Sequence, residues 1–176
     1  MSANIRNFIL LVVFAGLSAI TTHAMWSYYE WRVIPYIILI LSIVVVGENI
    51  VSSQGYYHYT RQAVNGPFVR NMPIWIMFLW IFSVQASLLI AIFMGLNGVS
   101  AILFSGWFSL TVDFLFLEPF MSRRKELWRW TPVENGYFEF IPDRMNRFTA
   151  PPGNYVAWFV FPFLANCFLA VLMLLF

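Results

Sequence analysis

Five long apolar segments constrain this chain more than any other feature. A helix needs about 20 mainly apolar residues to cross the hydrocarbon core of a bilayer. Segments that qualify lie at residues 7–25, 33–53, 73–95, 98–120 and 154–176. The third and fourth are joined by only a few residues, so they must form an antiparallel helical hairpin. The sequence therefore predicts an all-α fold: a polytopic membrane helical bundle of about five transmembrane helices, in one domain spanning residues 1–176.

The composition supports a multi-pass protein of the cell membrane. Hydrophobic residues make up 61% of the chain and charged residues only 10%, whereas a soluble domain carries about a quarter. A net charge of +2 is too small to suggest nucleic acid as a partner, and a single cysteine excludes an internal disulfide. Arg6 and the stretch 22–24 loosely fit a signal peptide, but we expect a retained first helix.

The basic residues divide unevenly between the two sides of such a bundle. With five crossings, the N-terminus and the aromatic, basic loops 54–72 and 121–153 share one side. Nine Lys and Arg residues fall on that side, and only Arg32 falls on the other. The positive-inside rule therefore predicts that the N-terminus and both long loops are cytoplasmic. We expect these loops to fold back as a lid over the cytoplasmic helix ends.

Three carboxylates lie in or beside the predicted helices. Glu48 lies roughly 22 Å along the second helix and Asp113 roughly 21 Å along the fourth, so both reach a similar depth. Glu118 lies closer to the inner interface, where it is either solvated or paired with Arg123 or Arg124. A charge within the bilayer costs several kcal/mol unless it is paired, protonated or hydrated. Glu48 and Asp113 therefore point into the bundle, as active-site acids or as a polar clamp.

Other polar residues recur along the predicted helices, including Ser105, Ser109, Gln85 and Asn166. Such stripes mostly bind helices together, and here they also suggest an interior cavity that opens toward the cytoplasm. His23 and His58 are predicted on opposite sides of the membrane, so they cannot share a metal. We expect no metal site and no cofactor.

Two groups of short motifs follow one another in order. Glu48 precedes Gly55-Tyr56-Tyr57-His58-Tyr59-Thr60, Gly66-Pro67 and Pro73-Ile74. Asp113 and Glu118-Pro119 precede Trp128, Trp130, Gly136-Tyr137, Ile141-Pro142 and the stretch NYVAWF at 154–159. In this order they resemble the carotenoid hydratase family of membrane proteins, over roughly residues 45–165. The chain is shorter than that family, carries an insertion at 143–153, and has Glu118 one residue further from Asp113 than the family's second acid.

The resemblance implies acid-catalysed addition of water to a terminal isoprenoid alkene by a cofactor-free hydratase, a lyase. A carboxylic acid would protonate the alkene, and water would capture the tertiary carbocation. The candidate catalytic residues are Asp113 and Glu48, with Glu118 third. The candidate substrate-binding residues are Tyr57, Trp107, Trp128 and Asn166. The partner would be a carotenoid or a membrane lipid.

An alternative stays open beside the enzyme. A chain of this size and apolarity also suits a non-catalytic accessory or structural subunit of a larger membrane complex, such as a monooxygenase, oxidase or photosynthetic assembly. The run at 73–82 is apolar all round and suits contact with lipid or with a partner helix. In that role Glu48 and Asp113 would fix packing, and the aromatic residues would bind lipid or pigment.

Overall fold

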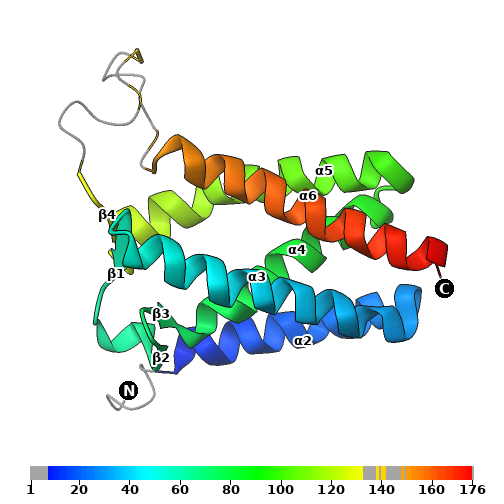
Figure 1. Ribbon diagram of the computed structural model, residues 1–176, viewed down its shortest axis with the longest axis horizontal. Helices are drawn as coiled ribbons and strands as arrows, with labels where there is room; N and C mark the ends of the chain where they lie inside the picture. Colours follow the sequence, from blue (N-terminus) through cyan, green and yellow to red (C-terminus); the bar gives the residue numbers. More distant parts are fainter. Residues whose placement is uncertain (1–7, 133–137, 139, 142–147, 149, 176) are drawn as a thin grey trace.

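The protein is a bundle of long helices, which Figure 1 shows from the side with the helices running horizontally. The computed structural model describes residues 8–132, 138, 140–141, 148 and 150–175. Its helices are α2 (Ile9–Tyr29), α3 (Val33–Ser53), α4 (Ile74–Phe93), α5 (Gly98–Val112) and α6 (Pro152–Leu175). Four helical stretches are long and apolar enough to cross a membrane: Ile9–Ser53, Ile74–Phe93, Gly98–Arg124 and Pro152–Leu175. This confirms an all-α bundle with the character of a membrane protein.

The first of these stretches, 45 residues long, is a hairpin of two helices. The short 3₁₀ turn η1 (Glu30–Arg32) separates α2 from α3, and the chain reverses there (Figure 1). Glu30 adopts a φ of 52°, a conformation that is uncommon outside glycine. Both helices are 21 residues long, and the first extends four residues beyond its expected end.

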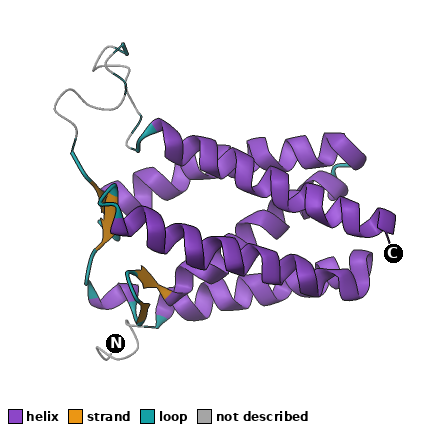
Figure 2. Ribbon diagram, in the orientation of Figure 1, coloured by secondary structure: helices purple, strands orange, loops and turns teal. Residues whose placement is uncertain are grey.

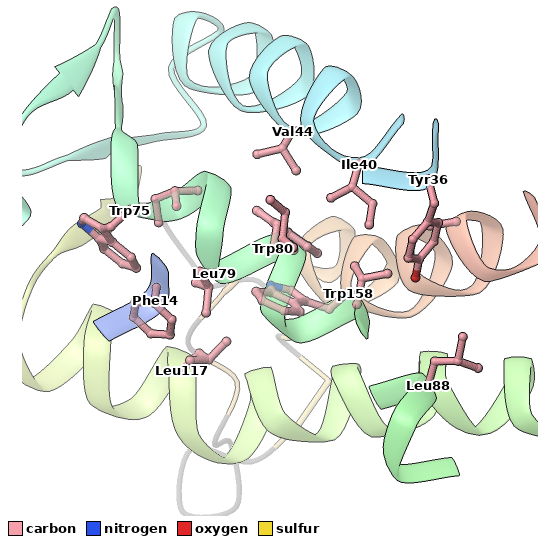
Figure 3. Packing of buried hydrophobic residues seen from close by; sticks show 14 of the residues in the cluster. Phe14, Tyr36, Ile40, Val44, Trp75, Leu79, Trp80, Leu88, Leu117 and Trp158 are labelled. Atoms are coloured by element: carbon pink, nitrogen blue, oxygen red, sulfur yellow. The ribbon is translucent and has the colours of Figure 1, made fainter. Parts of the chain in front are cut away.

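Helix α4 forms the core of the bundle. It contacts α2, α3, α5 and α6 and buries Trp75, Leu79, Val84 and Leu88. Figure 3 shows three of these, Trp75, Leu79 and Leu88, among buried residues of the other elements. A helix that is apolar all round is typically buried. The run at 73–82 therefore serves the interior of this protein, rather than presenting a lipid or partner surface as the sequence alone allowed.

The two long loops meet at one end of the bundle, where Figure 2 shows all the strands. Strand β1 (Tyr57–Tyr59) pairs antiparallel with β4 (Trp128–Trp130), and β2 (Phe68–Val69) pairs with β3 (Met72–Pro73). We call the β1–β4 pair the ribbon. Beside the 3₁₀ turn η2 (Ala63–Asn65), the side-chain amide of Asn65 donates to the carbonyl of Thr60 (2.7 Å) and to that of Leu127 (2.8 Å). The described parts of the two loops therefore contact each other at this end of the bundle.

Some polar side chains inside the bundle join helices. Gln85 of α4 accepts hydrogen bonds from Thr21 and Thr22 of α2. Asn166 of α6 accepts from the hydroxyl of Tyr36 in α3 and donates to Ser105 of α5 (2.8 Å). These contacts fit the expectation that such stripes bind helices together.

Helices α5 and α6 approach closely at Gly106. A Cβ atom there would lie 2.9 Å from the backbone oxygen of Phe159. We expect Gly106→Ala to lower stability by about 1–3 kcal/mol, because the helix backbones must move apart. The measurement is the thermal unfolding midpoint in detergent. Gly16→Ala in α2 is the matched control, because a Cβ there meets nothing within 4 Å; equal midpoints for both variants would contradict this account.

Candidate functional site

Glu48 lies near the end of α3 and accepts hydrogen bonds from three aromatic side chains. The hydroxyls of Tyr57 and Tyr59 both donate to Oε2, the latter at 2.9 Å. The indole of Trp80 in α4 donates to Oε1 at 2.9 Å. The carboxylate is therefore held in place from the ribbon on one side and from the central helix on the other.

Glu118 is held in the same manner by the other strand of the ribbon. It lies in the π-helix η3 (Asp113–Arg124), which continues α5. The indole of Trp128 donates to Oε1 at 3.1 Å, and that of Trp130 donates to Oε2 at 3.0 Å. Glu118 is only 1% exposed, so the expectation of a solvated residue at the interface was wrong. The reason is tertiary: the ribbon covers this acid and separates it from bulk solvent.

The ribbon's register explains how one small element contacts two acids. Side chains alternate between the two faces of a strand, and Tyr57 lies opposite Trp130 while Tyr59 lies opposite Trp128. These four rings share the inner face, and His58 and Arg129 between them are exposed. The alternation in YHY and WRW was a visible signal of such strands. Nothing in the sequence indicated that these two segments, about 70 residues apart, pair with each other.

Asp113 is the first residue of the π-helix and precedes Glu118 by five residues. It is 0% exposed, and its Oδ2 accepts a hydrogen bond from the side-chain amide of Asn154 (2.8 Å). No partner lies on Oδ1 among the described residues. Asp113 and Glu118 are five residues apart, which would place them on different faces of an α-helix. Since a π-helix closes its turn at i→i+5, this wider turn brings both acids to one face and accommodates their longer spacing.

Glu48 lines a mainly apolar groove of about 510 Å³. The groove lies between α3 and α6. Its apolar wall comprises Ile43, Val44, Gly47, Val51, Ala157 and Phe161, and its polar end comprises Glu48, Tyr56, Tyr57, Trp80, Trp130 and Asn154. The volume is within the range of small-molecule sites, which are usually apolar with a few placed polar groups.

A second cavity, of about 50 Å³, lies between the two glutamates. Glu48 and Glu118 both line it, together with Tyr59, Trp128 and Asn154. One buried water needs about 10–15 Å³, so the space accommodates a few water molecules. Glu48, Trp80, Trp130 and Asn154 line this cavity as well as the groove, so a ligand in the groove would end beside it.

The structure brings together only some of the residues singled out from the sequence. Glu48, Glu118, Tyr57 and Trp128 meet around the small cavity, and Asp113 reaches it through Asn154. Trp107 lies elsewhere, 60% exposed on the outside of α5 with its ring edge on Phe159. It follows Gly106, which faces α6, and one helical step turns it outward.

Asn166 also lies away from the groove, with both ends of its amide used in the contacts to Tyr36 and Ser105. Conversely, Trp80 was missed because nothing distinguishes it within a uniformly apolar run. Its indole stacks on Trp158 with ring centroids 4.1 Å apart. Asn154 and Tyr59 were part of the motif order, but their contacts with Asp113 and Glu48 needed the structure.

Burial, followed by the charge of Glu48, raises the pKa of Tyr57 and Tyr59 well above the usual value. The neutral hydroxyls therefore stabilise the fold below the unfolded pKa of about 10, and this stabilisation is lost as the pH rises further. We expect the unfolding midpoint to fall above pH 10, and to fall less steeply in Tyr57→Phe/Tyr59→Phe. Tyr28→Phe, at an exposed tyrosine, is the control. A double variant with the wild-type pH slope would contradict this assignment.

The described residues include no group of three or more His, Cys, Asp or Glu side chains that would hold a metal ion. Gly136-Tyr137 of the motif order, and the basic residues Arg6, Arg144 and Arg147, lie outside the described residues. Comparisons with models of known protein families, with curated proteins and with solved structures each return no match.

Proposed function

We propose that this protein is a cofactor-free membrane hydratase that adds water to the terminal alkene of an isoprenoid chain such as a carotenoid. One observation carries the proposal: Glu48 lines the apolar groove and also borders a small cavity that is lined by a second carboxyl group, that of Glu118. An apolar chain suits the groove, and water suits the cavity. The resemblance to carotenoid hydratases, which includes Glu48, Tyr57 and Trp128, supports the same chemistry.

In the proposed mechanism, Glu48 is the proton donor because it is the acid that lines the groove. Its proton passes to the terminal alkene carbon, and the π electrons form the new C–H bond. The neighbouring carbon becomes a tertiary carbocation. Water from the small cavity adds to this carbon, and its released proton passes to Glu118 across the cavity. The alcohol leaves, and transfer of that proton back to Glu48 restores the starting state.

The surrounding groups have supporting roles in this scheme. The rings of Tyr57, Trp80 and Trp130 border the polar end of the groove, where aromatic faces would stabilise a developing cation. Asp113 acts through Asn154, which it holds at the edge of both cavities. Asp113 is thus a positioning residue in this proposal, whereas from the sequence it was, with Glu48, a candidate catalytic acid.

The proposal includes five membrane crossings with the N-terminus and the ribbon in the cytoplasm. In support, α2 begins and α6 ends at opposite ends of the bundle (Figure 1), which requires an odd number of crossings. Arg61, Arg123 and Arg124 lie at the ribbon end and Arg32 lies at the turn opposite. In a Cys167→Ala background, a cysteine at Trp31 should react with an impermeant reagent in intact cells, and a cysteine at His58 only after permeabilisation. The reverse pattern would invert the topology.

The functional test is direct. The full chain is purified in mild detergent and incubated with lycopene in heavy-oxygen water. We expect a product heavier by one water that carries the heavy oxygen, and a much smaller yield with Glu48→Gln. A chain that copurifies with stoichiometric partner subunits and forms no product would overturn the hydratase. That result would favour the accessory-subunit alternative.

A further inference from the structure

Among the described residues, no cationic side chain forms a salt bridge with Glu48. Its hydrogen-bond donors are the neutral side chains of Tyr57, Tyr59 and Trp80. Within the described parts of the chain, the one salt bridge joins Arg129 to Glu126 (2.6 Å), and both of these side chains are exposed. The carboxylate of Glu48, which lines the groove, therefore gives this part of the groove the electrostatic character of a cation site.

The walls of this site determine which cation fits. Tyr57 and Trp130 have ring centroids 4.9 Å apart at an angle of 59°, and Trp80 and Tyr56 border the same space. A carboxylate beside several aromatic faces suits an alkylated ammonium, which binds such rings through its diffuse charge. The rest of the groove is aliphatic or aromatic, so it suits hydrocarbon. The described residues offer no metal-binding cluster at this position.

We propose that the groove binds a single-chain ammonium amphiphile, with a quaternary or tertiary ammonium head beside Glu48 and its alkyl chain between α3 and α6. The charge of Glu48, the aromatic end and the apolar wall together favour this occupant. This binding requires no catalysis, so it goes beyond the proposed hydratase. If that activity holds, the ammonium head also mimics the tertiary carbocation, which lies beside the carboxylate that remains once Glu48 has given up its proton, and it competes with substrate.

The test uses the full chain in a non-ionic sugar detergent and two ligands of the same shape. One is a dodecyl chain ending in trimethylammonium, and the other is the same chain ending in an uncharged tert-butyl group. We expect the ammonium ligand to bind at least about tenfold more tightly, as one cation–aromatic contact with an added charge attraction implies. Equal affinities in the wild-type protein would overturn the proposal without any variant being needed.

Variants then locate the site. Glu48→Gln should reduce the affinity for the ammonium ligand to that of the uncharged ligand, whereas Glu126→Gln, an exposed acid at the same end, should leave it unchanged. Trp130→Leu, which keeps Glu48, should lower the preference partly. Loss of preference in Glu126→Gln alone would place the cation elsewhere and overturn the assignment.

The outcomes for binding and for hydration are separable. Selective ammonium binding without a hydration product would retain the cation site and reject the hydratase. A hydration product without ammonium selectivity would do the opposite.

Discussion

Glu48→Gln is expected to lower the rate of hydration by about 10²–10⁴-fold, the range for loss of a general acid. Glu48 is the acid that borders both the groove and the small cavity. A glutamine has nearly the same shape but no acidic proton to give to the alkene. The measurement is product formed per folded protein, with heavy-oxygen incorporation as the readout.

The stability of this variant must be measured beside its rate. The glutamine NH₂ group would face a donor, either a tyrosine hydroxyl or the indole of Trp80, at a cost of about 1–3 kcal/mol. Glu126→Gln is the matched control, because it makes the same chemical change at an exposed acid. A folded Glu48→Gln protein with the wild-type rate would remove Glu48 from the mechanism and leave it as a polar clamp.

Gly47→Leu is expected to block the groove and leave the fold intact. Gly47 lines the groove, and a Cβ atom added there meets nothing within 4 Å. A leucine therefore extends into the space meant for ligand rather than into another part of the protein. We expect affinity for a long-chain ligand or substrate to fall by about 5–150-fold, which corresponds to an overpacking cost of about 1–3 kcal/mol.

The control for this prediction is the same glycine-to-leucine change at a position away from the groove. Gly16→Leu in α2 also extends into open space, but Gly16 lies on the exposed face of a helix that does not line the groove. Both variants should unfold at nearly the wild-type temperature, and only Gly47→Leu should lose binding. If Gly47→Leu bound long-chain ligands as the wild type does, the groove between α3 and α6 would not be their site.

The helices themselves were predictable from the sequence. Apolar runs of membrane-spanning length have one stable solution in a bilayer, because every backbone polar group must be paired within the segment. The expected segments 33–53, 73–95 and 154–176 agree with α3, α4 and α6 to within two residues at each end. The importance of Glu48 was also apparent, since the cost of an acid at that position demands a buried partner.

The geometry of the site was decided only by the tertiary structure. The residues that hold Glu48 and Glu118 come from β1, β4 and α4, and no local pattern specifies that these segments meet. Trp80 looks like its apolar neighbours until α3 packs beside it. The same applies to Trp107 and Asn166, whose residue types suited a ligand but whose helix faces direct them to the exterior and to a helix clamp.

What the sequence determined by itself is therefore the helical, apolar character of these segments, because burial of hydrocarbon and satisfaction of the backbone depend on composition and length. What the tertiary structure decided is which side of each helix faces inward, since helices that are apolar nearly all round carry little information about their own orientation. The acids, the ribbon and the groove become one site only when packing selects those faces.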